Sequence, residues 1–316
     1  MTTNSRWWKL AEWVGLLATP VLLVGLFQWP EPTLQILWNV VIPLVPASLL
    51  LTPLMWRNTC PLSTLNLHGN KISDAPWPPS WFVAAAPVIG IALFAALVPA
   101  RRFLFNQNGT ALGITILAVG VLAVLLGALS KVRSGFCNAI CPVLPVERLY
   151  GQRPILKVGH TRCCTVCSAT CIDPSPRQAP LVALGESFDS SRWLATPFGA
   201  FAAAFPGFVF GYFQTADGPL GSAVSVYATV FLGAAASYAI IAVITGLVGV
   251  PATRVLPVLA ALAAGTYYWF AAPQLTATLG LGAPAGQAAR ILFTLFVFGW
   301  WVRAQAKAVP APASTT

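Results

Sequence analysis

Long runs of apolar residues, separated by shorter polar segments, dominate the chain. A helix needs about 20 residues to cross the hydrocarbon core of a bilayer, and eight runs approach or reach that length. The predicted fold is therefore all-α, a polytopic membrane protein with about eight transmembrane helices. The count is seven or eight, because one run is short and Arg290 interrupts the last. The predicted spans are Trp13–Phe27, Leu34–Met55, Phe82–Val98, Ala111–Leu129, Trp193–Phe213, Val224–Val248, Val255–Phe270 and Ala285–Val302.

Composition and charge agree with this pattern. Hydrophobic residues make up 57% of the chain and charged residues only 8%, against about 25% charged residues in soluble domains. The net charge of +10 could indicate a nucleic-acid partner, but its distribution fits membrane topology better. With the N-terminus inside, only Arg101, Arg102 and Arg290 fall in outside segments. We expect a multi-pass protein of the bacterial cytoplasmic (inner) membrane, in contact with lipid and not with nucleic acid, with every cysteine on the cytoplasmic side.

Four segments follow from the order of apolar and polar stretches. Residues 1–130 hold the first four predicted helices and a Cys-Pro loop at 56–80. Residues 131–192 are too long for a hairpin and are expected to form a small cytoplasmic cap on the membrane. Residues 193–303 form a second, cysteine-free membrane half of four helices, and the Pro- and Ala-rich residues 304–316 are expected to be disordered.

Seven cysteines carry the chemistry that the sequence suggests. Cys164, Cys167 and Cys171 have the spacing of the last three ligands in the bacterial ferredoxin run C-x2-C-x2-C-x3-C-P, which binds iron–sulfur clusters. Cys137 and Cys141 are four residues apart, so on a helical turn they would share a face. All seven are candidate metal ligands: Cys60, Cys137, Cys141, Cys163, Cys164, Cys167 and Cys171.

An internal repeat connects two of these cysteine segments. The first reads Trp56-x3-Cys60-Pro61 and follows the second predicted helix; the other reads Cys137-x3-Cys141-Pro142 and follows the fourth. We call residues 56–61 the first Cys-Pro arm and residues 137–142 the second. Trp56 occupies in the first arm the position that Cys137 occupies in the second. The repeat makes Cys60 a predicted ligand, although a lone buried cysteine would be unremarkable.

The ligand set leaves alternatives open. Seven thiols cannot fill two four-cysteine sites, so the chain holds either one 4Fe–4S cluster or two with one non-cysteine ligand. His160 lies beside the ferredoxin-like run and is the candidate for that ligand, with His68 and Asp173 as further candidates. Zinc is the rival metal, because C-x2-C segments also bind zinc. Disulfides do not fit a reducing compartment.

These residues together resemble a known family, the membrane-bound polyferredoxins of the NapH/NosR type. Cys137, Cys141 and Pro142 match one arm of that family, and Cys60 with Pro61 matches half of the other. The ferredoxin-like run matches three of four positions, and the resemblance covers about residues 1–180. It implies 4Fe–4S clusters on the cytoplasmic face and electron exchange between the quinone pool and a partner enzyme.

The sequence therefore predicts a membrane-integral iron–sulfur electron-transfer subunit that relays electrons between a quinone and a protein redox partner. No nucleophile triad, phosphate loop or carboxylate pair is present, so no catalytic residue is predicted and substrate chemistry is expected on other subunits of a redox complex. Basic residues in 131–192 could attract a soluble acidic electron carrier. The alternative is a structural or docking subunit whose cysteines hold a stabilising metal, either zinc or a redox-silent cluster. A proton- or ion-coupled transporter fits less well, since no Asp or Glu lies in a predicted span.

Overall fold

Helices joined by short turns make up the part of the chain that can be placed. The computed structural model describes residues 5–69, 79–129, 136–137, 139–156, 183–184 and 191–306, and these ranges contain no β-strand. The other residues, among them Cys163, Cys164, Cys167, Cys171 and His160, lie outside the described part, as do Asp173 and the tail from 307 onward.

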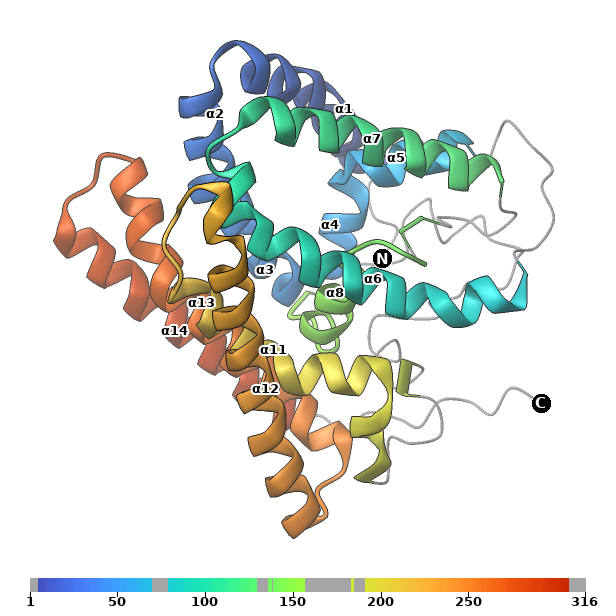
Figure 1. Ribbon diagram of the computed structural model, residues 1–316, viewed down its shortest axis with the longest axis vertical. Coiled ribbons are helices and arrows are strands. Elements are labelled where there is room, and N and C mark those ends of the chain that lie inside the picture. The colour runs from blue at the N-terminus through green and yellow to red at the C-terminus, as the bar shows by residue number, and fades with distance from the viewer. Residues whose placement is uncertain are drawn as a thin grey trace.

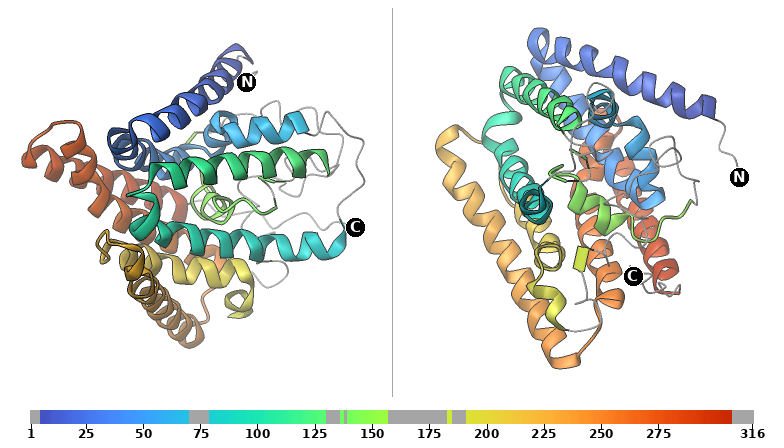
Figure 2. Two further views of the ribbon diagram at one scale, coloured as in Figure 1. Left: turned by 45° about the horizontal axis from the view of Figure 1, so that its top comes forward. Right: turned by 90° about the vertical axis from the view of Figure 1, so that its right-hand side faces the viewer.

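The first half contains three long helices (Figures 1 and 2), α1 (Ser5–Gln28), α6 (Ser80–Ala100) and α7 (Gly109–Ala128), of which α1 and α7 pack against each other. The π-helix η2 (Arg101–Phe105) extends α6. The start of α7 packs closely on the end of α1, since a Cβ atom at Gly109 would lie 2.5 Å from the carbonyl oxygen of Leu26. Close approach of this kind is typical of membrane helices, which associate through small residues.

The element between α1 and α6 is a helix broken into pieces. It consists of α2 (Pro30–Ile36), the π-helix η1 (Leu37–Val41), α3 (Ile42–Leu51), α4 (Pro53–Thr59) and α5 (Pro61–Gly69). The breaks fall at Thr52 and Cys60, whose backbones are extended, with ψ of 124° and 118°. Each of these residues precedes a proline, and the proline ring disfavours the helical conformation of the residue before it. The predicted span Leu34–Met55 therefore ends earlier, at Leu51.

Two helical hairpins form the second half: α11 (Pro197–Phe213) with α12 (Ala223–Val248), and α13 (Ala252–Thr278) with α14 (Ala283–Gln305). The first hairpin is joined through glycines. A Cβ atom at Gly207 would lie 2.0 Å from the carbonyl oxygen of Gly233, and Gly207 and Gly211 form the small-x3-small pattern that lets helices touch.

Seven helices in the described part are long and apolar enough to cross a membrane, so the chain is a multi-pass helical protein. The predicted run Trp193–Phe213 is the exception in length. Its first residues form the 3-10 helix η4 (Ser191–Ala195), and α11 is left with 17 residues. Large apolar side chains such as Leu17, Leu232 and Leu292 are more than half exposed, as expected for helices that face lipid.

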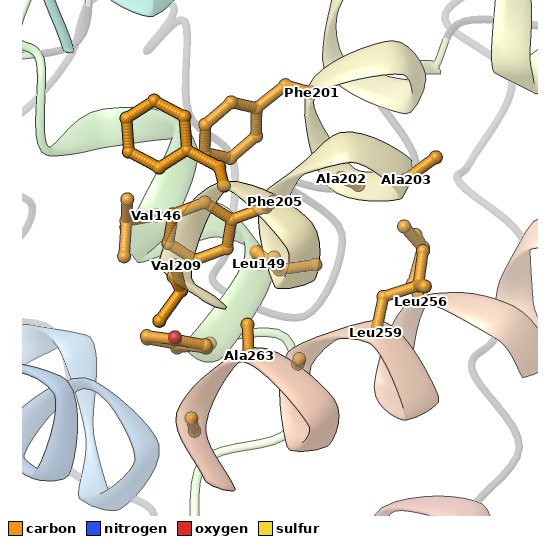
Figure 3. Close-up of a cluster of buried hydrophobic side chains, with 14 of the residues drawn as sticks. Val146, Leu149, Phe201, Ala202, Ala203, Phe205, Val209, Leu256, Leu259 and Ala263 are labelled. Atoms are coloured by element: carbon orange, nitrogen blue, oxygen red, sulfur yellow. The ribbon is translucent and has the colours of Figure 1, made fainter. Parts of the chain in front are cut away.

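A short helix lies in the interior of the molecule. All seven residues of α8 (Leu144–Tyr150) are buried, and the helix packs against α3, α6, α11 and α13 (Figures 1 and 2). Figure 3 shows Val146 and Leu149 of α8 beside Phe205 of α11, with Leu256 and Leu259 of α13 in the same cluster. The seven residues of α8, which belong to the predicted cap segment 131–192, therefore lie inside the helix bundle.

Both halves of the chain hold the segment that follows α8. The backbone N–H groups of Ile155 and Leu156 donate to the carbonyl oxygens of Leu50 and Leu51, at 3.2 and 2.8 Å. From α14, the two terminal nitrogens of the Arg303 guanidinium donate to the carbonyl oxygens of Pro154 and Ile155, both at 2.9 Å. The indole N–H of Trp300 donates to the carbonyl of Arg153 at 3.0 Å. One role of the cysteine-free half is thus to fix residues 153–156.

Candidate functional site

The first Cys-Pro arm places Cys60 at the junction of α4 and α5. Its N–H still donates to the carbonyl of Trp56 at 2.9 Å, which closes the last turn of α4. Its carbonyl accepts from Ser63 N–H at 3.1 Å and so begins α5. Because Pro61 keeps Cys60 out of the helical conformation, the buried cysteine stands at a break between two helices.

The second arm is a tight turn around one carbonyl group. The oxygen of Phe136 accepts hydrogen bonds from the N–H groups of Ala139, Ile140 and Cys141, at 3.3, 3.1 and 3.1 Å. Cys141 then lies outside any helix, directly before Pro142, and its carbonyl accepts from Leu144 N–H at 3.0 Å to begin α8. The repeat seen in the sequence is therefore also a repeat in local structure, with a cysteine at a break before a helix.

The loop of the second arm packs between α6 and α7. Phe136, Ala139 and Ile140 form a cluster with Ala86 of α6 and Ala123 of α7. A Cβ atom at Gly90 would lie 3.3 Å from the carbonyl oxygen of Cys141. Gly90 is near the middle of the 26-residue span Ser80–Phe105. The arm thus lies beside the middle of a membrane-spanning helix and not beyond its end.

The two arms bring Cys60, Cys137 and Cys141 into one neighbourhood. Burial is the main cause that raises the pKa of each thiol: the pKa of Cys60 is raised, that of Cys137 is raised well above its usual value, and that of Cys141 is raised to about 12. The second cause for both Cys137 and Cys141 is the nearby charge of Cys60. The metal-free thiols are therefore protonated at neutral pH, and binding of a metal as thiolates would release protons.

An ion pair joins the first arm to α8, the helix that follows the second arm. The Nε of Arg57, on the last turn of α4, donates to Oε1 of Glu147 on α8. The two side chains are 17% and 8% exposed, so the pair is largely buried. The sequence analysis did not select Glu147, because residues 143–150 are too few to read as a span. The signal available was the pair of opposite charges at 147 and 148 within an otherwise apolar stretch.

The structure brings together three of the predicted ligands and leaves His68 outside that group. His68 is exposed on α5, with its Nδ1 2.8 Å from the carbonyl oxygen of Thr64. Among the described residues, no three His, Cys, Asp or Glu side chains stand close enough to bind a metal ion together. The three thiols are neighbours that do not yet converge on one point. Their chemistry fits an iron–sulfur cluster or zinc, both of which take thiolate ligands.

An apolar cavity of about 260 Å³ adjoins both arms. Trp56 of the first arm and Pro142 of the second contribute to its wall, together with Val146 and Tyr150 of α8. The sequence analysis did not predict this cavity. It did single out Trp56 as the residue that replaces a cysteine in the repeat, and here the indole lines the cavity. Aromatic residues of η1, α11 and α13 complete much of the wall: Trp38, Phe205, Phe208, Tyr212, Phe213 and Tyr267.

The described part of the site thus has three components: three neighbouring thiols, of which Cys60 is buried and Cys137 and Cys141 are partly buried, an ion pair between the first arm and α8, and an apolar cavity beside them. All three lie in the interior of the helix bundle. We found no protein-family model, no curated protein and no solved structure that matches this chain.

Proposed function

We propose that the protein is a membrane-integral iron–sulfur electron-transfer subunit that relays electrons between the quinone pool and a protein redox partner. The observation that carries this proposal is the meeting of the two Cys-Pro arms, which are far apart in the sequence, around thiols that are buried or partly buried. Thiolates are the usual ligands of iron–sulfur clusters. Beyond the three described thiols, the sequence contains four more: Cys163, Cys164, Cys167 and Cys171.

The surroundings of the arms favour electron transfer over a solvent-exposed metal site. Burial and hydrogen bonds to sulfur are the means by which a protein sets the reduction potential of a bound cluster, which supplies one-electron redox chemistry. The prolines after Cys60 and Cys141 hold both thiols at fixed breaks in the helices. Arg57 of the first arm pairs with Glu147 of α8, the helix that follows the second arm.

The partner in this proposal supplies the substrate chemistry. The described residues offer no catalytic group beyond the thiols, and basic residues of the segment 131–192 would attract an acidic electron carrier or an acidic face of another subunit. His160 stays the candidate for a non-cysteine ligand if two clusters are bound. The cytoplasmic face of a bacterial inner membrane is the proposed location of these contacts.

Metal analysis of the intact protein tests the proposal. The chain is purified anaerobically, its iron, sulfide and zinc are quantified, and its EPR spectrum is recorded after reduction with dithionite. About eight irons per chain indicate two 4Fe–4S clusters and about four indicate one. Cys60→Ser and Cys141→Ser should each lower the iron content and change the EPR signal. Ser63→Ala, which removes a buried hydroxyl one turn from Cys60, should leave both unchanged.

A structural or docking subunit is the second candidate, and one observation favours it. No three His, Cys, Asp or Glu side chains among the described residues are placed to hold a metal together, and a docking role, unlike electron transfer, requires no redox centre there. Zinc without iron or sulfide would establish this alternative. Cysteine-to-serine changes would then reduce assembly with partner subunits, while no reversible reduction would be seen in the wild type.

A further inference from the structure

The cavity beside the arms has one end that is chemically different from the rest. The thiol end is formed by Trp56, Pro142 and Val143, and the opposite end by Trp38 and Arg101. Gly90, beside Cys141, precedes Arg101 by 11 positions on α6. At about 1.5 Å per residue, the two ends are about 16 Å apart along the helix axis.

Two π-helices form the end that holds Arg101. Trp38 belongs to η1 and Arg101 begins η2. The Arg101 Cζ lies 4.1 Å from the ring centroid of Trp38 and 5.7 Å from that of Tyr212. Its Nε donates to Oδ1 of Asn106 at 2.9 Å, which fixes the guanidinium. π-helical turns are rare and occur frequently at functional sites, and here two of them face each other across a charged group.

Two buried polar atoms in the wall at this end lack partners. The hydroxyl of Tyr212 and the indole N–H of Trp38 have no hydrogen-bond partner among the residues that the structure describes. Tyr212 is only 5% exposed. A buried donor without an acceptor is costly, and a ligand oxygen at this end of the cavity would accept from either group. The wall therefore suits a molecule with an apolar body and an oxygen acceptor.

A second hollow of about 400 Å³ adjoins the first on the side of α6, α11 and α12. Its lining is wholly apolar, and three phenylalanines, Phe94, Phe205 and Phe208, belong to the walls of both hollows. An apolar tail attached to a ring in the first cavity would fit along this groove. The first cavity, at about 260 Å³, lies just below the range of about 300–1,000 Å³ common for small-molecule sites, so it suits a single ring system.

We propose that this cavity binds the headgroup of a membrane quinone, with Trp38, Arg101 and Tyr212 at the carbonyl end and the isoprenoid tail along the phenylalanine-lined groove. The assignment rests on the proposed function for its choice of ligand, because a quinone is the ring-shaped lipid that a membrane electron carrier would use. Aromatic rings on several sides of the cavity match a planar headgroup better than a flexible acyl chain.

Quinone binding to the purified full-length chain tests the assignment. Short-tailed benzoquinone and naphthoquinone are titrated separately by calorimetry, and an azido-benzoquinone is cross-linked and mapped by mass spectrometry. Tyr212→Phe should raise the Kd about five- to tenfold, the usual effect of one lost hydrogen bond, and Trp38→Phe should weaken binding similarly. Tyr238→Phe is the matched control, since its hydroxyl contacts the carbonyl of Leu194 away from the cavity, and its Kd should stay within about twofold.

The outcomes separate this assignment from the proposed function. The assignment is supported, for whichever quinone binds, by cross-links to peptides containing Trp38 or Tyr212 together with a higher Kd in the two cavity variants than in the wild type and the Tyr238→Phe control. Unchanged Kd values in both cavity variants overturn it, as do cross-links confined to lipid-facing helices or full displacement of the quinone by phospholipid. Iron and sulfide are measured in the same samples. Iron with unchanged Kd values overturns the cavity alone, while quinone binding without iron overturns only the electron-transfer proposal.

Discussion

Replacing Glu147 by Gln would remove the charge that pairs with Arg57 while keeping the shape of the side chain. Both partners are largely buried, at 8% and 17% exposed. Loss of one member of a buried ion pair typically costs about 3–5 kcal/mol, because the other charge is left uncompensated. The amide oxygen of Gln can still accept from Arg57, so we expect a loss near the lower limit, about 3 kcal/mol in the free energy of unfolding.

The double variant Arg57→Met with Glu147→Leu should behave differently. Replacing a buried pair by apolar residues of similar size is often neutral, so its stability should lie within about 1 kcal/mol of the wild type. Asp217→Asn is the control, since Asp217 pairs with Arg102 at 3.0 Å but is 45% exposed, and such pairs contribute about 0–1 kcal/mol.

The assay is unfolding of the metal-free protein in mixed detergent micelles, followed by circular dichroism under anaerobic conditions. A loss below about 1 kcal/mol for Glu147→Gln would refute the reasoning, because it would mean that the pair is hydrated. The reasoning would also be refuted if the double variant were less stable than either single variant. The pair would then stabilise the protein in a way that apolar residues of similar size cannot replace.

Three further predictions concern packing, protonation and anchoring. Gly207→Ala should cost about 1–3 kcal/mol, because the added carbon meets the Gly233 carbonyl at 2.0 Å, whereas Gly246→Ala, with open space around it, should not destabilise the protein; both are measured by the same unfolding assay. In the metal-free protein, alkylation of Cys141 should be slow at pH 8 and accelerate toward pH 12, because burial raises its pKa to about 12; mass spectrometry of labelled peptides measures the rate. Because the pKa of Cys141 in the folded state lies above its usual value, its contribution to the stability of the fold is complete below about pH 8.5 and is lost as the pH rises toward the folded-state pKa. Arg303→Met should increase hydrogen exchange in residues 151–156, because two charged hydrogen bonds, each contributing about 1.5–3 kcal/mol, are lost. Unchanged exchange there would show that the bonds from Arg303 do not hold the segment.

The apolar runs of the sequence were enough to predict most of the helices. They did not predict where helices are interrupted or which segments are buried inside the bundle. Seven of the eight predicted spans overlap helices that are long and apolar enough to cross a bilayer, while the fifth, Trp193–Phe213, contains only the shorter helix α11. The early end of the second span at Leu51 follows from Pro53 and could have been anticipated from the rule for residues that precede proline. The shortening of the fifth span follows from Thr196 and Pro197, an N-cap residue with proline at the first helical position, and this start signal was also present in the sequence.

The interior position of α8 could not be inferred from local pattern. Its seven residues are too few to read as a membrane helix, and Glu147 and Arg148 make the stretch resemble a polar loop. Burial of the Glu147 carboxylate is tolerated because Arg57, 90 residues away in the sequence, pairs with it. The same holds for the cavity, whose wall combines residues from six α-helices, both π-helices and both arms. The cysteine repeat drew attention to the two Cys-Pro arms, but the closeness of their thiols could be seen only in the tertiary structure. The ligand partition among all seven cysteines stays a prediction.

The hydrogen bonds from α14 to the segment after α8 have a consequence for biogenesis. Arg303 is made 149 residues after Pro154, which corresponds to about 7–30 s at ordinary rates of synthesis. During that interval α8 and the second arm have been produced, but the helix that fastens residues 153–155 has not. We expect a ribosome-arrested chain that stops before α14 to expose residues 151–156 to protease, and the complete chain to protect them. The nascent protein thus has a period of about 7–30 s in which residues 153–155 lack the hydrogen bonds that α14 later donates to them.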